Sequence, residues 1–119
     1  MENKTITTTN GYTAILKPFL TYDDFVEVQK IWTKSASFDP NGDLTKPVYD
    51  KIPMDIMYEA NALMLTILVV SITDKDGKVV EREADKLPIP PADGQEIMNA
   101  VNVIYKEAAD SFSKKKLTE

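Results

Sequence analysis

The chain has 119 residues, of which 43% are hydrophobic and 28% are charged, and its formal net charge is -5. It contains no Cys and no His, which excludes disulfides, thiol nucleophiles, iron–sulfur clusters and every catalytic or zinc site that needs histidine. The acidic balance argues against nucleic-acid binding, which normally uses a basic face. The length suits one domain, because a domain of this size buries at most about 65% of its unfolded surface.

The N-terminus lacks the basic segment and following apolar stretch of a secretory signal peptide. The longest apolar stretch, residues 62–72, is shorter than the roughly 20 residues that a membrane span requires. We therefore expect a single domain over residues 1–119 that resides in the cytoplasm and has no membrane partner.

Residues 1–20 predict a β-hairpin, because two short runs of strand-forming residues flank Asn10-Gly11. That dipeptide tolerates the positive φ angles of a type I′ turn and is the strongest short signal for a hairpin. Pro18 ends the second strand, since it has no N–H for the ladder. An isolated hairpin is only marginally stable in water, so this one must pack on another element.

The next segment, residues 21–34, has the pattern of a helix. Thr21 can cap its first turn, and Asp23 and Asp24 suit the positive end of the helix dipole. The apolar residues on one stripe at helical spacing are Phe25, Val28, Ile31 and Trp32. Trp32 has two interpretations, an anchor for a partner or a core aromatic, and the stripe favours the core.

Residues 35–52 have no clear period and predict a long loop, which in a compact domain is usually functional or disordered. Its apolar side chains are costly to leave in water, so they either fold back on the core or wait for a partner. Methionines adapt to irregular surfaces and suit the same role. The candidate partner-binding residues are Phe38, Val48 and Tyr49 in this loop, followed by Met54 and Met57.

The same loop suggests a calcium site as an alternative. Positions 1, 3, 5 and 12 of a twelve-residue window hold Asp39, Asn41, Asp43 and Asp50. These are positions that supply calcium ligands in an EF-hand. The match is incomplete, because the expected Gly at position 6 is Leu44 and the expected Glu at position 12 is Asp50. An Asx-rich turn is the simpler interpretation.

Residues 53–70 predict a second helix, with Pro53 at its first position, where the missing N–H costs nothing. The apolar residues follow a helical stripe at first and fill every face towards the end. This pattern fits a buried helix, but it also fits a switch to β structure with a second short hairpin near residues 67–82. Periodicity leaves both open, and we predict helix through Val70.

A charged and then proline-rich connection leads to a third predicted helix over residues 93–113. Asp93 and Glu96 match a capping box at its start. Its apolar stripe contains Ile97, Val101, Ile104 and Ala108. The predicted fold is therefore α+β, mainly α, with the N-terminal β-hairpin packed on about three helices.

Nothing in the sequence points to catalysis. No pair of carboxylates stands against an apolar run that would shift a pKa, and the GxGxxG, GxxxxGK[ST] and GxSxG motifs are missing. We expect no enzyme activity, no catalytic residue, no metal site and no cofactor, apart from the calcium alternative.

The order of elements is similar to that of a known family. A Thr-rich hairpin runs into residues 15–25 (ILKPFLTYDDF), and a later helix leads to residues 68–72 (LVVSI) and an Asp/Gly turn. Residues 87–94 then lead into the closing helix. This order, with the strand–Leu-x-x-x-Leu-Thr–helix junction at residues 16–21, resembles the small tail assembly chaperones of long-tailed bacteriophages over most of the chain.

The resemblance implies a non-enzymatic role. Members of this family bind the tape measure protein and tail tube protein before assembly, keep them soluble and leave before the virion matures. It implies location in the host cytoplasm and absence from the mature virion, and it leaves self-association open. The alternatives are a phage structural subunit, such as a tail terminator or connector, or a calcium-binding module that uses the Asp39–Asp50 loop.

Overall fold

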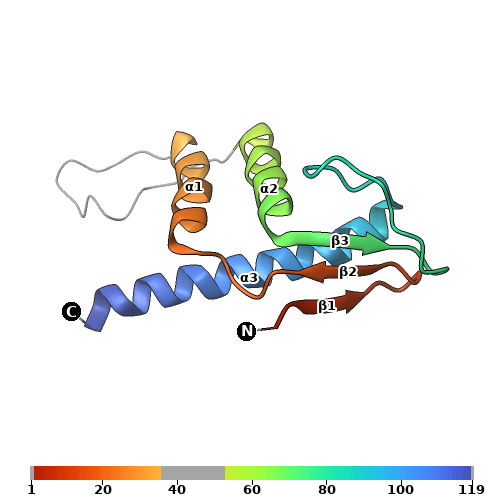
Figure 1. Ribbon diagram of the computed structural model, residues 1–119. Helices are drawn as coiled ribbons and strands as arrows, with labels where there is room; N and C mark the ends of the chain where they lie inside the picture. The colour runs from red at the N-terminus through yellow and green to blue at the C-terminus, as the bar shows by residue number, and fades with distance from the viewer. Residues whose placement is uncertain (1, 36–52, 119) are drawn as a thin grey trace.

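The structure is a computed structural model that describes residues 2–35 and 53–118 (Figure 1). In order, its elements are β1 (Lys4–Thr7), β2 (Thr13–Leu16), α1 (Tyr22–Trp32), a short 3-10 helix (Thr33–Ser35), α2 (Met54–Leu68), β3 (Val69–Thr73) and α3 (Pro91–Thr118). The predicted α+β, mainly α fold with an N-terminal hairpin packed on helices is confirmed.

The described strands form one antiparallel sheet in the order β1-β2-β3. Ile6 pairs with Ala14, and Ala14 pairs with Ile72, so one row of apolar side chains crosses the sheet on the face towards the core. The register between β2 and β3 shifts at Ile15 and Leu16. Such an irregularity bends a strand, and it lies where the chain leaves the sheet for α1.

The hairpin forms as predicted, but its turn is not type I′. The Thr8 N–H donates to the Tyr12 carbonyl at 2.7 Å, and the Gly11 N–H donates to the Thr8 carbonyl at 3.0 Å. Gly11 has a φ of 93°. Among the described residues only glycines have a positive φ, so Asn10 does not adopt the conformation that a type I′ turn requires. The loop therefore has three residues between Thr8 and Tyr12 and closes on a left-handed glycine.

α1 begins as the sequence predicts. The Thr21 hydroxyl accepts a hydrogen bond from the Asp24 N–H at 3.1 Å and caps the first turn. Phe25, Val28 and Ile31 are buried. Trp32 is half-buried and packs against the core, as the apolar stripe favours. α1 and α2 lie side by side in Figure 1.

α2 passes directly into β3, so the prediction of helix through Val70 is wrong. The strand begins at Val69, because β-branched residues favour extended structure and a strand here buries Val69 and Ile72 while Val70 turns outward. The Lys17 N–H donates to the carbonyl of the last helical residue, Leu68, at 2.8 Å. The second hairpin takes a reduced form, with one isolated bridge between Thr73 and Val79.

The first and last turns of the later helices also differ from the predictions. Pro53 precedes α2 as its cap residue, and the helix itself begins one residue later. α3 begins at Pro91, because proline has the preset φ that suits the first helical position, so Asp93 lies inside the first turn and is not the cap. α3 continues to Thr118, beyond the predicted end at 113, through good helix formers.

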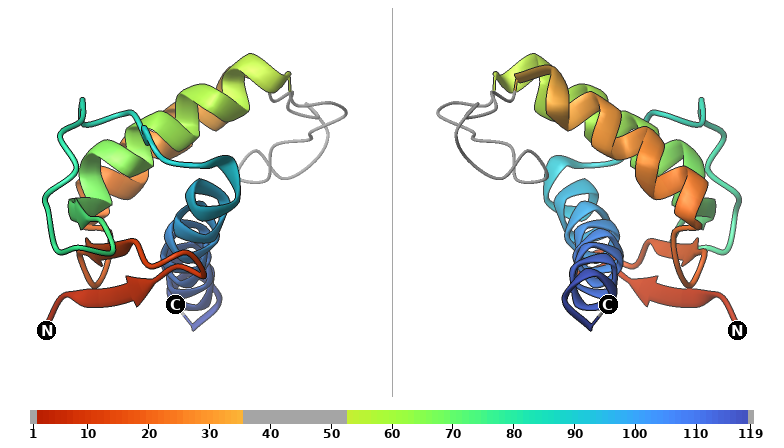
Figure 2. Two further views of the ribbon diagram at one scale, coloured as in Figure 1. Left: turned by 90° about the vertical axis from the view of Figure 1, so that its right-hand side faces the viewer. Right: turned by 90° about the vertical axis from the view of Figure 1, so that its left-hand side faces the viewer.

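The core lies between α3, the inner face of the sheet and the pair of α1 and α2. Figure 2 shows α3 nearly end-on, with the sheet beside it. The pair of α1 and α2 crosses above both of them. Fully buried side chains from every layer meet there: Leu16, Val28, Met64, Leu68, Ile72, Ile97, Val101 and Ile104. Each large aliphatic side chain of this kind contributes about 1.5–3 kcal/mol by leaving water.

Arg82 organises the connection between β3 and α3. Its Nη1 donates to the carbonyls of Glu83, Ala84 and Lys86 at 3.2, 2.7 and 3.2 Å, and its Nη2 donates to the Val69 carbonyl at 3.1 Å. Burial lowers the pKa of the Arg82 guanidinium from its ordinary value. The side chain therefore ties this irregular segment to the start of β3.

Candidate binding groove

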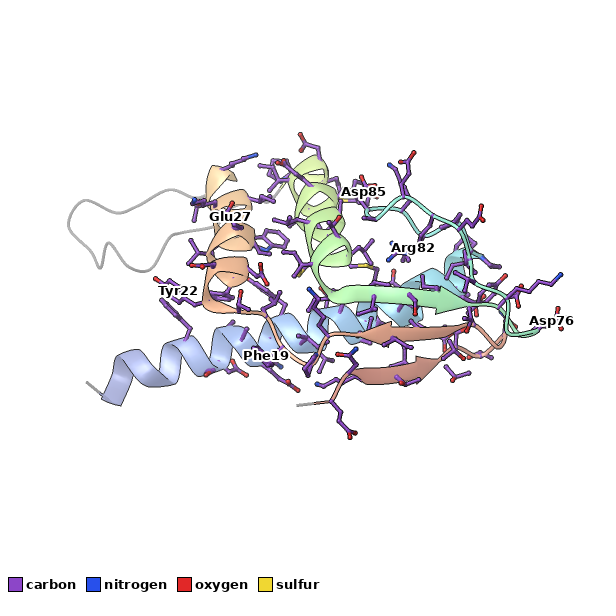
Figure 3. The ribbon with its side chains drawn as sticks, in the orientation of Figure 1. Phe19, Tyr22, Glu27, Asp76, Arg82 and Asp85 are labelled. Carbon is purple, nitrogen blue, oxygen red and sulfur yellow. The ribbon has the colours of Figure 1, made fainter. Side chains whose placement is uncertain are left out.

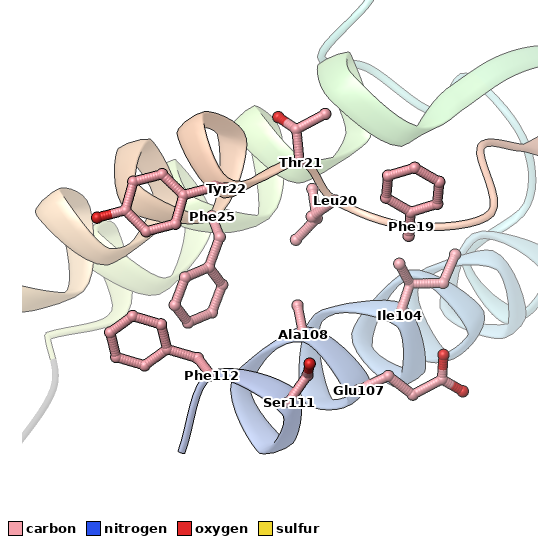
Figure 4. A pocket seen from close by; sticks show the side chains of 10 residues that line it. All are labelled: Phe19, Leu20, Thr21, Tyr22, Phe25, Ile104, Glu107, Ala108, Ser111 and Phe112. Carbon is pink, nitrogen blue, oxygen red and sulfur yellow. The ribbon is translucent and has the colours of Figure 1, made fainter. Parts of the chain in front are cut away.

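A groove of about 340 Å³ lies between the start of α1 and the C-terminal half of α3 (Figure 4). Its walls come from three parts of the chain: the β2–α1 linker, the first turn of α1 and one face of α3. The lining residues are Phe19, Leu20, Thr21, Tyr22, Phe25, Ile104, Glu107, Ala108, Ser111 and Phe112. We call this feature the aromatic groove.

The linker and the first residue of α1 each place an aromatic side chain on the outside of the molecule. Leu20 is 6% exposed and holds the linker to the core. Its neighbours at the groove, Phe19 and Tyr22, are 53% and 69% exposed. Large aromatic side chains that gather around a concavity and stay exposed are typical of an interaction site.

The wall on α3 is built by helical spacing. Ile104, Ala108 and Ser111 lie three or four residues apart and so share one face of the helix. Phe112 follows on the same side, 43% exposed, and its ring centroid lies 5.5 Å from that of Phe25. Such aromatic pairs fix the relative position of two elements.

Tyr105 supports the same contact from behind. Its ring stacks on Phe25 at 5.7 Å, and its hydroxyl accepts a hydrogen bond from the Gln29 side chain at 2.8 Å. Phe25 is therefore held between two aromatic rings of α3, and the base of the groove is fixed. The exposed rings of Phe19 and Tyr22 also line the groove.

Two of the polar groups that line the groove have partners within the chain. The Thr21 hydroxyl accepts the hydrogen bond that caps α1, and Glu107 forms an exposed ion pair with Lys4 at 3.5 Å. Exposed ion pairs contribute little to stability. The groove therefore offers mainly apolar and aromatic contact, a chemistry that suits binding of another apolar surface.

A separate polar cluster joins the hairpin loop to the start of α3. The buried Asp93 carboxylate accepts hydrogen bonds from the Asn10 side chain at 3.0 Å and from the Asn10 N–H at 3.3 Å. Glu96 accepts from the Thr9 N–H at 3.0 Å and from the Thr9 hydroxyl at 2.8 Å. Hydrogen bonds from Asn10, and then from Thr8, hold the pKa of Asp93 below its usual value.

This arrangement explains why the predicted capping box is wrong. The carboxylates of Asp93 and Glu96 bind the backbone and side chains of the hairpin loop, 83 or more residues away in sequence, so the long-range contact replaces the local one. Negative charge in the first turn of α3 remains favourable for its dipole. The cluster is saturated by these bonds and serves to dock the hairpin.

The sequence-predicted partner residues do not build the aromatic groove. Phe38, Val48 and Tyr49 lie outside the described residues, and the choice of these three stays a prediction, as does the calcium loop from Asp39 to Asp50. Met54 opens α2 and is 56% exposed, and Met57 is half-buried one turn later; neither lines the groove.

Sequence reasoning missed Phe19, Tyr22 and Phe112 as site residues. Phe19 lies in the linker, outside any periodic stripe, and could have been singled out as a large aromatic after a strand-ending proline. Tyr22 stands next to Asp23 and off the apolar stripe of α1. Phe112 continues the stripe of α3 into turns that extend past the sheet, so helical spacing alone assigns it to the core.

Comparison with protein-family models, curated protein sequences and solved structures finds no match for this chain. Within residues 2–35 and 53–118, no group of three or more Asp, Glu, His or Cys side chains could hold a metal ion. None of the helices in the described part is long and apolar enough to cross a membrane.

Proposed function

We propose that this protein is a non-enzymatic tail assembly chaperone of a long-tailed bacteriophage. In this role it binds the tape measure protein, the tail tube protein or both in the host cytoplasm, and it is not part of the mature virion. The observation that carries the proposal is the aromatic groove, because its linker wall is the strand–Leu-x-x-x-Leu-Thr–helix junction on which the family resemblance rests.

The chemistry of the groove supports a binding role. Phe19, Tyr22 and Phe112 offer exposed apolar area to an unassembled client, and the lining groups of Thr21 and Glu107 are engaged within the chain. A small apolar contact gives modest affinity, since association also costs translational and rotational freedom. Modest affinity suits a chaperone that must release its client.

The composition supports the same role. A net charge of -5 favours solubility of the chaperone and of its complex with an apolar client. With neither Cys nor His, the chain lacks a thiol nucleophile, the commonest general base and the commonest transition-metal ligand. The proposal requires no cofactor and no turnover.

Coexpression with tagged tape measure and tail tube proteins from the same genome tests this function. We expect the chain to copurify with at least one client and to keep it soluble. Phe19→Ser and Tyr22→Ser should each weaken binding about tenfold, as truncation of a binding hot spot does. Tyr58→Ser is the matched control, because Tyr58 is 62% exposed on α2 and does not line the groove.

Protein identification on purified virions supplies the opposing outcome. A chaperone is expected in infected cells and not in mature particles. If the chain is instead present in virions in the amount of a ring or tube component, the structural-subunit alternative is correct and the chaperone function is wrong.

A further inference from the structure

The two edges of the sheet differ in how far the rest of the chain covers them. On the outer edge of β3, the Ile72 carbonyl accepts a hydrogen bond from the Val80 N–H at 2.8 Å. The Val69 carbonyl accepts one from the Arg82 guanidinium at 3.1 Å. Figure 3 shows the Arg82 side chain on the far side of β3 from β2. The connection between β3 and α3 therefore closes this edge to another strand.

β1 forms the opposite edge, and its register shows which backbone groups point away from the sheet. The Thr8 N–H donates to the Tyr12 carbonyl at 2.7 Å, two positions along the ladder from Ile6. Hydrogen-bonded and non-bonded pairs alternate along an antiparallel ladder, so Ile6 bonds to β2, whereas the N–H and C=O groups of Thr5 and Thr7 point outward. Within the described part of the chain, these outward groups have no hydrogen-bond partner.

β1 also lacks most of the features that keep an exposed edge strand from pairing. Natural sheets protect an edge with proline, a bulge or a charge. Residues 4–7 (KTIT) contain no proline, and their pairs with β2 follow one another without a register shift. The one charge, Lys4, lies at the first position and forms an ion pair with Glu107 of α3. The rest of β1 is therefore open to a further antiparallel strand, and in Figure 1 none of the described elements lies beyond it.

The residues of β1 are complementary to a second copy of themselves. Around a two-fold axis at Ile6, Thr5 of each copy lies opposite Thr7 of the other, and their outward N–H and C=O groups bond to one another. Ile6 then meets its own copy in a non-bonded pair, where side chains approach most closely. This contact continues the apolar row of Ile6, Ala14 and Ile72 across the axis and covers Ile6, which is half-buried in the single chain.

The neighbouring registers fit less well. An axis at Lys4 places two lysines directly opposite each other, and like charges in this position are unfavourable. An axis at Thr5 places Lys4 opposite Ile6, so a charge interrupts the apolar row. An axis at Thr7, the last residue of β1, pairs the rest of the strand with the turn. The axis at Ile6 joins apolar to apolar on the core face and Thr to Thr on the outer face.

From these observations we propose that β1 pairs with β1 of a second copy of this chain, around a two-fold axis at Ile6. The pairing joins the two three-stranded sheets into one continuous antiparallel sheet. Because the shared edge is short, the dimer is reversible and dissociates on dilution. This inference goes beyond the proposed function and does not depend on any client.

Sedimentation of the full chain tests the pairing. We expect dimers that dissociate on dilution between about 1 mM and about 1 µM. A chain that stays monomeric throughout this range overturns the proposal. If the chain is monomeric alone, but a client protects the Thr5 and Thr7 amides from hydrogen exchange, then the edge binds a client strand and the proposal is likewise wrong.

Charge variants test the register. Thr5→Lys combined with Thr7→Lys places positive charges opposite each other and should weaken the dimer at least about tenfold, although it makes the chain less negative overall. Thr5→Lys combined with Thr7→Glu places opposite charges across the axis and should restore the dimer. Both positions are exposed, and circular dichroism confirms that the variants are folded. A lysine–glutamate variant as weak as the double-lysine variant contradicts the axis at Ile6.

Single cysteines provide an independent check, because the chain has no Cys of its own. Ile6→Cys places two Cα atoms about 4.5 Å apart across the axis, which a disulfide can span. Thr5→Cys places them about 7–8 Å apart, beyond that reach. Val79→Cys is the control for random collision, since Val79 is 68% exposed and lies outside β1. Oxidation should link the Ile6→Cys variant at least about tenfold faster than the other two, and any other order overturns the proposal.

Discussion

Asp93 is the buried carboxylate that fastens the hairpin to α3, and its ionisation should govern stability in acid. Hydrogen bonds from Asn10 and Thr8 stabilise the charged form and lower the pKa of Asp93 in the folded state. A group with a lowered folded pKa contributes stability that is fully present above its unfolded pKa, about 3.9. That contribution is lost as the pH falls through the lower folded pKa.

We therefore expect Asp93→Asn to lower Tm by several degrees at neutral pH. The difference from the unmodified chain should shrink as the pH falls below the unfolded pKa of about 3.9 and then through the lower folded pKa, where Asp93 itself becomes protonated. Thermal unfolding followed by circular dichroism over this pH range measures the effect, with Asp76→Asn in an exposed turn as the control. A difference that stays constant down to about pH 2 would show that the charge of Asp93 does not matter.

Two glycines in neighbouring turns test how the N-terminal hairpin is held in position. Gly11 and Gly77 both have positive φ, at 93° and 81°, which costs an alanine roughly 1 kcal/mol or more. A Cβ on Gly11 would also lie 2.9 Å from the Lys75 Cβ, whereas a Cβ on Gly77 would meet nothing within 4 Å. The two sites therefore separate backbone strain from the contact between the turns.

Gly11→Ala should destabilise the fold by about 2–3 kcal/mol and Gly77→Ala by about 1 kcal/mol. Urea denaturation of the two variants gives both values under the same conditions. Equal losses would mean that the turn carrying Lys75 moves aside freely, and the close approach of the two turns would then contribute nothing to the position of the hairpin.

The elements that the sequence predicts correctly are those with strong local signals. The cap at Thr21 and the hairpin at Asn10-Gly11 depend on residues close in sequence. The end of α2 could not be predicted, because an apolar run fits a buried helix as well as a strand, and pairing with β2 decides for strand at Val69. The prediction that Asp93 caps α3 is wrong for a similar reason, since its hydrogen-bond partner is Asn10 at the other end of the chain.

The aromatic groove is a property of the whole molecule, and local patterns could not predict it. Phe19 comes from the linker and Phe112 from α3, so only the packing of α1 against α3 brings their neighbourhoods together. Weak periodicity indicates apolar residues that the core does not need, and it therefore points to the long loop. Aromatic residues beside well-formed helices give no such signal.

The same packing predicts how the molecule unfolds. The buried cluster joins Leu16 and Ile72 of the sheet to residues of α1, α2 and α3, so no layer can lose its contacts alone. The one tryptophan, Trp32, packs against this cluster from α1. Its fluorescence and the far-ultraviolet circular dichroism of all helices should therefore report the same urea midpoint, as expected for cooperative unfolding of a small core.

Ile97→Ala tests this coupling from the far side of the core. Ile97 is fully buried on α3, and its truncation should cost about 2–5 kcal/mol, with both probes shifting together. Val103→Ala, on the same helix at a residue 54% exposed, should change stability by less than about 0.5 kcal/mol. If Ile97→Ala moves the circular dichroism transition but leaves Trp32 fluorescence unchanged, then α1 is stabilised independently of α3, and the aromatic groove between them would open without unfolding the core.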